Sequence, residues 1–549
     1  MAPIPPFSDC GLTRPKFPSI LRPVYLVRLS TSLLRYLVSV VSVSFLGDLS
    51  VKVPTENIVP PPALPPPALP VSTILLKERR DYNNSFPSTA PSSLGAPSQF
   101  SQIQEKDKQK IAWSRPPEAD SPIPVLLFHR IMREFVDNCN NHQPVDKDNL
   151  LVLNLTDAMS RFLQTDATRA ANVHNILIKH GIPITTSTND PEHPKSHDFL
   201  TDGAIDYGGH LISIFEVKNE ITSTGAEPYA QAILNYHHSV SEKSTEHPRF
   251  NFPCLIVTVF GQTFTSSLVY NTNAMFSGAH ISFSGAVRTS RPHFQVFTSI
   301  PLFCHKTDTN MRESLARHFG AFKKAISLLE ECYETLENPA LIEDLDPRFP
   351  DPRTYHSLET NSTVNFKYVG QMYAKRLLFL GKTDNGETIC IKFVRRYSRE
   401  AHEKCATLGF GPKLRGFEGI GAGWTMVVMD DLSEEYEPFD KNALDADTHE
   451  TDIRKGLNEL HQAHFVHGDV RDANIMVRMD GDPGFMLVDF DWAGIIGEAR
   501  YPANVNKVDF WRPDDVSDGM LIKAEHDMAM MNKIFHEDSL CSSAGESNL

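Results

Sequence analysis

The stretch HGDVRDANIMV, residues 467–477, places two aspartates, an arginine and an asparagine in one loop between apolar runs. Asp469 could accept a proton from a reacting hydroxyl group, and the side-chain oxygen of Asn474 could bind a metal ion. The alternative is a turn that these residues merely cap, because Asp and Asn in loops most commonly do so. The choice depends on which other reactive side chains the chain brings to this loop.

Two further segments carry candidate residues for the same chemistry. Lys392 lies in the β-type run ETICIKFV, and Asp489 follows the apolar run FMLV. Transfer of a phosphoryl group requires a base for the acceptor hydroxyl, metal ligands that bridge the phosphates, and a lysine that holds the nucleotide. All three kinds of residue are therefore present in the last third of the chain.

The elements that must position these residues can be predicted from their hydrophobic patterns. Apolar alternation predicts strands, a helix follows them, a buried strand ends in two acids, and an amphipathic helix leads into the loop. In chain order the expected elements are strands at 366–371, 374–382 and 387–394, a helix at 398–409, a strand at 424–432, a helix at 452–465 and strands at 475–477 and 485–488.

This order of elements and motifs resembles the protein kinases. The loop matches their catalytic pattern H-x-D-x-x-x-x-N, LVDFDW resembles D-F-G, and ICIKF resembles V-A-I-K. The resemblance implies that Asp469 is the catalytic base and that Asn474 and Asp489 are ligands of Mg²⁺. It also implies that Arg471 contacts the transferring phosphate, at the position where Ser/Thr kinases usually have a lysine.

The same resemblance implies an ATP site. Lys392 would contact the phosphates, with Glu400 as its partner on the following helix and Glu403 as the alternative partner. Met429 and Asp430, at the end of the predicted strand at 424–432, would contact the nucleotide.

The closest resemblance is to the fungal-type protein-kinase-like proteins, which share HGD-x-R, DFDWAG, RYP and a late HD. We expect the late Asp527 to be buried and to accept hydrogen bonds from the backbone of His467 and Gly468. The sequence departs from the kinase pattern in three places. The first hairpin carries the single glycine Gly370, Asp491 replaces the last glycine of D-F-G, and Gly468 replaces an arginine.

A second candidate site precedes the kinase-like region. In TDGAIDYGGHLISIFEVKNE, Glu216 and Lys218 share one face of a predicted strand, and Asp202 or Asp206 could join them. Two carboxylates and an ammonium group could bind Mg²⁺ and activate water. The pattern resembles the PD-(D/E)xK endonuclease-like superfamily, in which a helix with glutamine and tyrosine, here Gln231 and Tyr236, often follows. An exposed, solvated ion pair is the alternative.

The remaining composition limits the possible functions. The net charge of -15 and the excess of acidic residues between Arg115 and Arg291 give no strong nucleic-acid signal. Eight scattered cysteines without metal-ligand spacing indicate a reducing compartment. The apolar run RYLVSVVSVSFLG is too short to span a bilayer and is a poor signal peptide, so we expect an intracellular protein, cytoplasmic or nuclear, without a membrane partner.

We therefore predict an α+β protein with a two-lobed protein-kinase-like domain at 365–549. It would follow a disordered Pro/Ser-rich tail at 1–110, an α/β endonuclease-like domain at 111–338 and a linker at 339–364. The expected function is ATP- and Mg²⁺-dependent phosphotransfer, with a Ser/Thr protein substrate as the expected partner. Three alternatives stay open: an inactive pseudokinase or scaffold, a small-molecule kinase of the aminoglycoside or choline type, and a metal-dependent nuclease regulated by the kinase-like domain.

Overall fold

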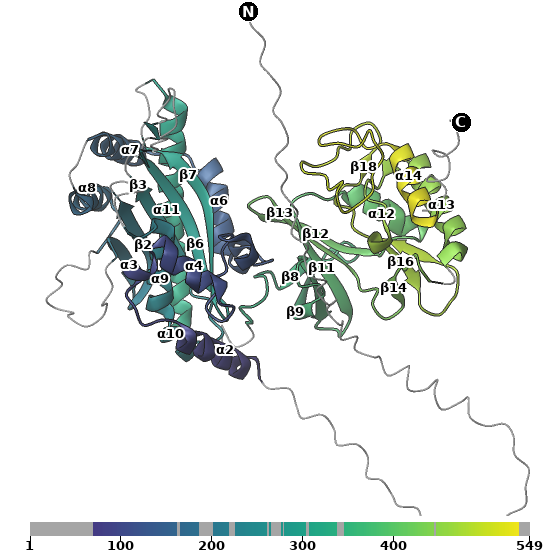
Figure 1. Cartoon of the computed structure of the whole chain (residues 1–549), viewed down its shortest axis with the longest axis horizontal. Helices are drawn as coiled ribbons and strands as arrows, with labels where there is room; N and C mark the ends of the chain where they lie inside the picture. Colours follow the sequence, from purple (N-terminus) through teal and green to yellow (C-terminus); the bar gives the residue numbers. More distant parts are fainter. Residues whose placement is uncertain are drawn as a thin grey trace, which may run out of the picture. The chain divides into compact units, whose positions relative to one another are not determined.

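A computed structural model gives the arrangement of the chain (Figure 1). The residues that it describes are 70–161, 165–185, 201–218, 225–260, 263–264, 276–277, 279–302, 307–337, 345–443 and 446–536. Residues Ala68–Leu549 form one compact unit, whose two larger β-sheets have five and six strands. Among the described residues, no helix is long and apolar enough to cross a membrane.

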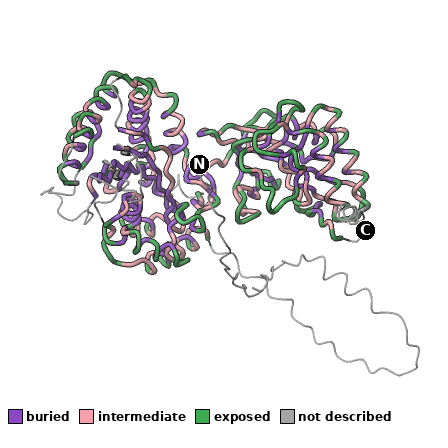
Figure 2. The backbone as a smooth tube through the Cα atoms, turned by 45° about the horizontal axis from the view of Figure 1, so that its top comes forward, coloured by how far each residue is buried: buried purple, intermediate pink, exposed green. Residues whose placement is uncertain are grey.

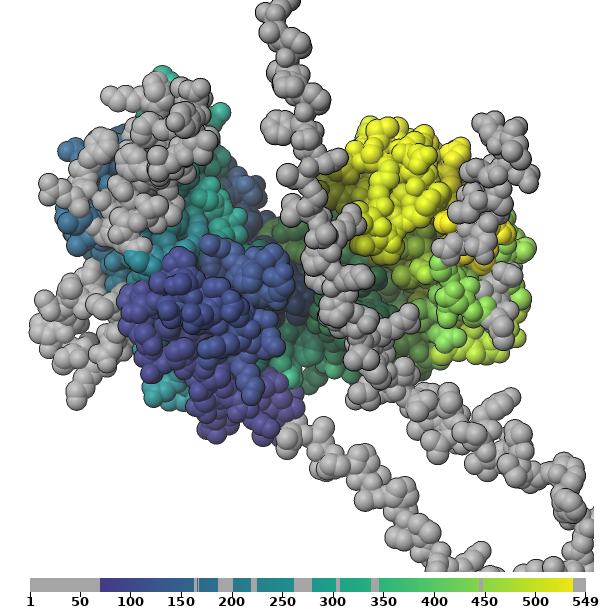
Figure 3. All heavy atoms as spheres, viewed as in Figure 1, coloured from purple at the N-terminus to yellow at the C-terminus, as the bar shows by residue number. Residues whose placement is uncertain are grey.

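The chain is helical well before residue 110, which corrects the predicted limit of the disordered tail. The helices are α2 (Val71–Ser85), α3 (Pro91–Leu94) and α4 (Pro97–Glu105). Several of their large residues, among them Leu75, Phe100 and Ile103, are buried, which explains how a polar segment is held in place. Figure 3 shows this purple segment as a continuous part of the molecular surface. Residues 1–69 of the predicted tail, with its apolar run, lie outside the described residues.

The five-stranded sheet has the order β1-β2-β3-β6-β7. As expected, β1 (Gly203–Tyr207) and β2 (His210–Lys218) form an antiparallel hairpin around a Gly-Gly turn. β3 (Cys254–Phe260) pairs parallel to β2, and helix α9 (Pro228–Val240) makes the crossover between them. The β-type run HFQVFTSIPLF, residues 293–303, predicts the edge strand β7 (Pro292–Pro301). β6 (His280–Arg288), which lies between β3 and β7, did not enter the sequence prediction.

Helices cover both faces of this sheet. Phe215 of β2 packs against Phe322 of α11, whereas the neighbouring Glu216 accepts a hydrogen bond from Asn235 of α9. The two faces therefore meet different helices, as the alternation of strand side chains requires. The helices of this part are α5 (Val125–Phe128), α6 (Arg130–Asn141), α7 (Asp146–Met159), α8 (Asp166–Lys179), α10 (Lys243–Glu246) and α11 (Thr309–Glu334).

The run IPVLLFHRIMREFVDNC, residues 123–139, repeats apolar residues at helical spacing and predicts one helix. It forms two helices, because His129 between α5 and α6 has an extended backbone and caps α6. Its Nδ1 accepts a hydrogen bond from the backbone N–H of Ile131 at 3.3 Å. The β-type run SLVYNT, residues 267–272, predicts a further strand and lies outside the described residues. Two short strands, β4 (Thr263–Phe264) and β5 (Phe276–Ser277), pair with each other.

The six-stranded sheet has the order β12-β13-β11-β10-β9-β8 and contains the three strands expected at 366–394. The predicted linker ends earlier than residue 364, because β8 already pairs with β9 in this sheet. Its strands are β8 (Thr354–His356), β9 (Thr363–Gln371), β10 (Leu378–Thr383), β11 (Thr388–Val394), β12 (Leu414–Gly421) and β13 (Trp424–Asp430).

The rest of this part is mostly helix and loop around a second core, whose buried members include Leu457 of α13 and Met531 of α14. In Figure 2, buried residues occur along both the strands and the helices of this part. The elements are α12 (Arg399–Leu408), α13 (Ala446–Gln462), α14 (Ala524–Phe535), the small sheet of β14 (Tyr436–Pro438), β16 (Ile475–Arg478) and β17 (Phe485–Leu487), and the pair of β15 (Phe465–Val466) and β18 (Gly494–Ile495).

Candidate phosphotransfer site

The loop after β15 is held by hydrogen bonds to a buried carboxylate of helix α14. Asp527 is fully buried, and its two oxygens accept hydrogen bonds from the backbone N–H groups of His467, at 2.8 Å, and Gly468, at 2.7 Å. His461 Nε2 lies 3.0 Å from the same carboxylate. This is the arrangement expected from the sequence, and it fixes the start of the loop to the helical core.

Gly468 stands where the kinase pattern has an arginine, and the structure gives a physical reason. Its φ of 83° lies in the left-handed region that favours glycine. A Cβ atom at this position would also lie 2.8 Å from Cδ1 of Ile522 and 3.3 Å from Cβ of Trp492. A longer side chain therefore requires both backbone strain and a rearrangement of the packing.

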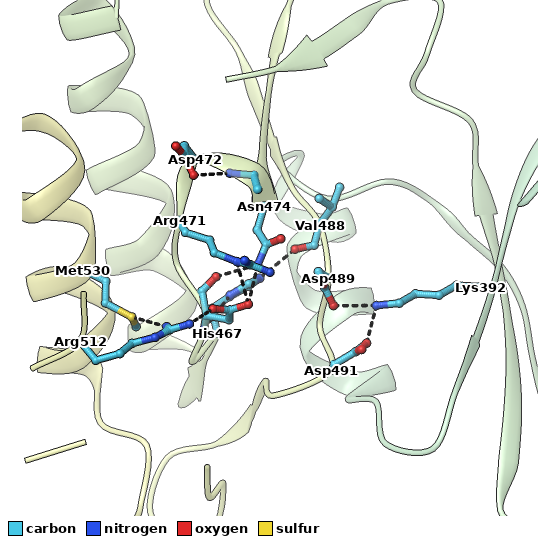
Figure 4. Close-up of polar contacts among 12 residues, drawn as sticks. Lys392, His467, Arg471, Asp472, Asn474, Val488, Asp489, Asp491, Arg512 and Met530 are labelled. Carbon is cyan, nitrogen blue, oxygen red and sulfur yellow. Dashed lines mark hydrogen bonds and ion pairs between the residues drawn. The ribbon is translucent and has the colours of Figure 1, made fainter. Parts of the chain in front are cut away.

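Asp469 is enclosed by donors on both carboxylate oxygens. Nδ2 of Asn474 donates to Oδ2 at 2.8 Å, and Nε of Arg471 donates to the same oxygen at 3.1 Å. The other oxygen, Oδ1, accepts a hydrogen bond from Nη2 of Arg512 (Figure 4). The side chain of Asp469 is only 9% exposed, so its charge is balanced by these groups more than by solvent.

The lysine of the third expected strand reaches the acids after β17. Nζ of Lys392 lies 2.6 Å from Oδ1 of Asp489 and also pairs with Asp491 (Figure 4). Burial opposes the charged lysine, but the two carboxylates outweigh it and raise the pKa of Lys392. Burial also opposes ionisation of Asp489, yet the nearby lysine lowers the pKa of Asp489, whereas burial and the charge of Asp489 raise the pKa of Asp491.

The backbone of Asp489 is strained. Its φ of 73° lies in the left-handed region, which a non-glycine residue adopts at a cost. Such strain persists only where surrounding contacts impose it, and it gathers at functional sites. Here Phe490 is fully buried between the rings of His402 and His467, with centroids 4.6 and 5.4 Å away, so the packing of the next residue fixes the turn.

The expected ion pair between Lys392 and the following helix is absent. Glu400 is exposed at the start of α12, and the alternative Glu403 pairs with Arg399 on its own helix. The buried member of this helix beside the site is His402, whose ring stacks on Phe490. Asp491 supplies the second carboxylate to Lys392 instead, so the acid comes from the departure in D-F-G and not from the helix.

A cavity of about 660 Å³ lies beside these residues and is large enough for a nucleotide-sized ligand. Met429 and Asp430 both line it, as expected, although the carboxylate of Asp430 also pairs with Arg415. The turn between β9 and β10 has no glycine-rich loop and instead places Lys375 and Arg376 on the cavity wall.

One orphaned atom in this site fits a metal ion. Oδ1 of Asn474 is buried and has no hydrogen-bond partner among the described residues, while Nδ2 of the same amide is occupied by Asp469. An amide oxygen and a carboxylate such as Asp489 are oxygen ligands of the kind that Mg²⁺ prefers. Within the described part of the chain, no group of three or more His, Cys, Asp or Glu side chains is arranged to hold a metal ion, so substrate oxygens or water would have to complete the coordination.

The second candidate cluster is also brought together. Nζ of Lys218 lies 3.8 Å from Oδ2 of Asp202 and 3.7 Å from Oε2 of Glu216. Asp202 also accepts a hydrogen bond from the backbone N–H of Val217 at 2.7 Å. Asp206, the alternative first acid, instead accepts a hydrogen bond from the backbone N–H of Gly209 in the hairpin turn, so it caps the turn.

Helix α9 contacts this cluster through a residue that the resemblance to the endonuclease-like superfamily did not indicate. Nδ2 of Asn235 donates to Oε1 of Glu216 at 2.6 Å, whereas Gln231 is buried one turn earlier and the hydroxyl of Tyr236 donates to the carbonyl of Phe252. Glu216 is fully buried, and desolvation together with nearby Asp202 raises its pKa well above the usual range.

Arg512 and Asp491 are the site residues that sequence reasoning missed as participants. Arg512 lies 43 residues beyond Asp469 in a segment without any helical or strand period, so no local signal points to it. Asp491 had a signal, because an acid replaces a glycine next to a metal-binding motif, but it was interpreted only as a departure from the pattern.

No model of a known protein family matches the chain. No curated protein matches its sequence. Protein kinases are among the solved structures that resemble it. The Cydia pomonella granulovirus kinase PK-1 has a TM-score of 0.27 and 16% identity, over 32% of this chain and 69% of that chain. Vaccinia related kinase 3 has a TM-score of 0.26 and 14% identity, over 34% of this chain and 69% of that chain. Likeness at this level assigns no activity, so a function must be inferred from the side chains themselves.

Proposed function

We propose that the chain is an ATP- and Mg²⁺-dependent phosphotransferase that acts on a hydroxyl group. The observation that carries this proposal is the convergence of Asp469, Asn474, Asp489 and Lys392 on one site beside a cavity. Three separate segments supply these four residues, and each has the chemistry that phosphoryl transfer needs. A turn that is merely capped would not require the lysine of β11 or the orphaned amide oxygen of Asn474.

Each side chain has a distinct role in the proposed reaction. Lys392 and Arg471 meet the negative charge of the phosphates, and Asp469 orients the acceptor hydroxyl and receives its proton. The acceptor oxygen forms a bond to the γ-phosphorus as the bond between that phosphorus and the β,γ-bridging oxygen breaks, which leaves ADP. Asp489 and Asn474 would hold Mg²⁺, which when bound neutralises charge on the phosphate oxygens.

The first variants separate binding from chemistry. Asp489→Ala should abolish Mg²⁺-dependent ATP binding, because it removes the carboxylate ligand. Asp469→Asn should keep ATP binding and lower the transfer rate by about 10² to 10⁴, the usual contribution of general-base catalysis. ATP affinity from calorimetry and transfer of labelled phosphate from ATP, measured on both variants, test this assignment.

The pseudokinase alternative has a clear signature. A wild-type protein that binds Mg²⁺-ATP but shows no transfer that Asp469→Asn diminishes would be a nucleotide-binding scaffold and not an enzyme. The turn between β9 and β10, which carries no glycine where protein kinases have a glycine-rich loop, is the observation that favours this alternative.

The acceptor class is a finer proposal, and we favour a Ser or Thr hydroxyl of a protein. Incubation with labelled ATP, a protein extract and a set of aminoglycosides and choline separates the two classes by where the label appears. Label on a small molecule alone would replace the protein-kinase proposal with a small-molecule kinase.

A metal-dependent nuclease is the second candidate function, and it concerns the separate cluster of Asp202, Glu216 and Lys218. In the part of the chain that the structure describes, Oε2 of Glu216 is buried without a hydrogen-bond partner, so it could accept a metal ion. Incubation of single- and double-stranded DNA with Mg²⁺ and either wild type or Asp202→Asn tests it. Cleavage that Asp202→Asn does not reduce would come from a contaminant and would dismiss this function.

A further inference from the structure

Arg512 is buried against the loop that carries the proposed base. Its side chain is 3% exposed, and Nη2 donates to Oδ1 of Asp469. The guanidinium also lies over the ring of Trp492, 5.0 Å from its centroid, and contacts the sulfur of Met530 on α14 (Figure 4). One side chain therefore joins the base, the segment after Asp489 and the helix that anchors the loop.

The charge of Arg512 is matched by Asp469. A guanidinium group cannot lose its proton at ordinary pH, and a buried charge is costly unless it is paired. Asp469 is the carboxylate that forms the ion pair with Arg512, and Nε of Arg512 is buried without a hydrogen-bond partner in the described part of the chain. The counter-charge of Arg512 is therefore the carboxylate that the proposed reaction uses as its base.

The two oxygens of Asp469 are held from opposite sides. Arg512 binds Oδ1, while Asn474 and Arg471 bind Oδ2. Rotation of the carboxylate would break a hydrogen bond on one side or the other, so its orientation is fixed. Each carboxylate oxygen has two acceptor sites, so the three donors still leave room for an acceptor hydroxyl.

The segment around Arg512 also contacts Arg471, the other arginine that binds Asp469. Phe510, two residues earlier, places its ring 4.7 Å from the guanidinium of Arg471, whereas Trp511 between them is 46% exposed. Residues 510 and 512 therefore both face the loop at 467–474, and a displacement of this segment would move both cations away from Asp469.

We propose that Arg512 is a positioning residue for phosphotransfer: it holds the carboxylate of Asp469 oriented toward the acceptor hydroxyl. This inference rests on the proposed function, and it assigns a role to a residue outside every motif of the sequence. The opposite role, in which Arg512 blocks the base, predicts a faster enzyme when the arginine is removed, so the two roles differ in the sign of the effect.

The test compares Arg512→Met with Arg500→Met. Arg500 lies in the same region, is exposed and donates to the carbonyl of Gly519, so it is a matched control that does not touch the site. We expect Arg512→Met to lower kcat about 10²-fold, the usual effect of a misplaced catalytic group, with ATP affinity unchanged. Arg512→Lys should recover part of the rate, and added methylguanidinium should partly rescue Arg512→Ala.

A second measurement does not depend on activity. Asp469→Asn leaves the buried Arg512 without its counter-charge and should lower the unfolding temperature, and Arg512→Met in the same chain should restore part of it. Additive effects of the two substitutions would overturn the charge pairing. If Arg512→Met does not fold, Arg512→Gln, which also removes the charge, gives the same comparison.

The outcomes separate this inference from the proposed function. No transfer by the wild type would overturn both. Transfer by the wild type with an equal or higher kcat in Arg512→Met would overturn only the positioning role and would indicate that the arginine blocks the base. A fall in ATP affinity in proportion to kcat would also overturn it, because that pattern indicates a purely structural role.

Discussion

Replacing Asp527 should destabilise the helical part of the chain by an amount that follows from its contacts. Asp527→Ala leaves the buried N–H groups of His467 and Gly468 without acceptors. An unsatisfied buried donor costs about 1 to 3 kcal/mol, so the two together cost about 2 to 6 kcal/mol. For a domain of about 150 to 250 residues, each kcal/mol of lost stability lowers the unfolding temperature by about 2 to 4 °C, so we expect a fall of at least about 4 °C.

Tryptophan fluorescence is a suitable assay for this change. Three of the four tryptophans, Trp424, Trp492 and Trp511, lie between residues 345 and 536, the part of the chain that also contains Asp527. The fluorescence signal therefore reports mainly on these residues. Glu525→Ala is the matched control, because Glu525 is exposed on the same helix and an exposed substitution changes stability by about 0.5 kcal/mol or less. Equal melting of the two variants would refute the proposed anchoring of the loop.

Three further predictions concern other parts of the molecule. Gly468→Ala should cost more stability than Gly497→Ala. Both glycines have a positive φ, but a Cβ atom at position 497 would have open space around it. Urea unfolding of the two variants would isolate the clash at position 468, and equal costs would contradict it. The double substitution Lys375→Ala, Arg376→Ala should weaken ATP binding by about 10-fold at most, with a smaller effect at high salt, and calorimetry at two salt concentrations checks this. Burial raises the pKa of Glu216 in the folded protein. The contribution of Glu216 to stability is therefore present below the unfolded pKa of about 4.3 and is lost as the pH rises toward the folded pKa. Glu216→Gln should raise the unfolding temperature at pH 8 but not at pH 4. An equal change at both pH values would exclude this explanation.

The motifs were the most predictable part of the site. Asp469, Asn474 and Asp489 sit in loops that directly follow short strands, and such loops are marked in the sequence by acids after apolar runs. The position of Asp527 was also predictable, because a carboxylate can be buried only where it has donors, and the nearby loop backbone supplies them.

The partner of Lys392 was not predictable in this way. The spacing pointed to Glu400 in the first turn of α12, but that residue faces solvent and Asp491 takes the position. A helical residue reaches a strand only if the helix is rotated toward it, and the rotation of α12 depends on packing of His402 against Phe490. Such packing involves residues far apart in the chain, which local patterns do not encode.

The segment 71–105 shows the same limitation. Its composition of Ser, Pro and Gln predicted disorder, yet its few large side chains enter the core beside distant elements. Arg79, for example, donates to backbone carbonyls of Ser244, Phe250 and Arg288. A segment too polar to form a core alone can still be ordered when a separate core accepts it.

The sequence by itself determined the identity and order of the reactive residues, because these are carried by short motifs at the ends of strands. The tertiary structure alone decided which charges meet. Arg512 reaches Asp469 across 43 residues of chain, and Asp491 reaches Lys392 from the turn after β17. The physical reason is that a buried charge must find a counter-charge in space, and the folded packing of distant segments, not their spacing in sequence, sets which one lies within reach.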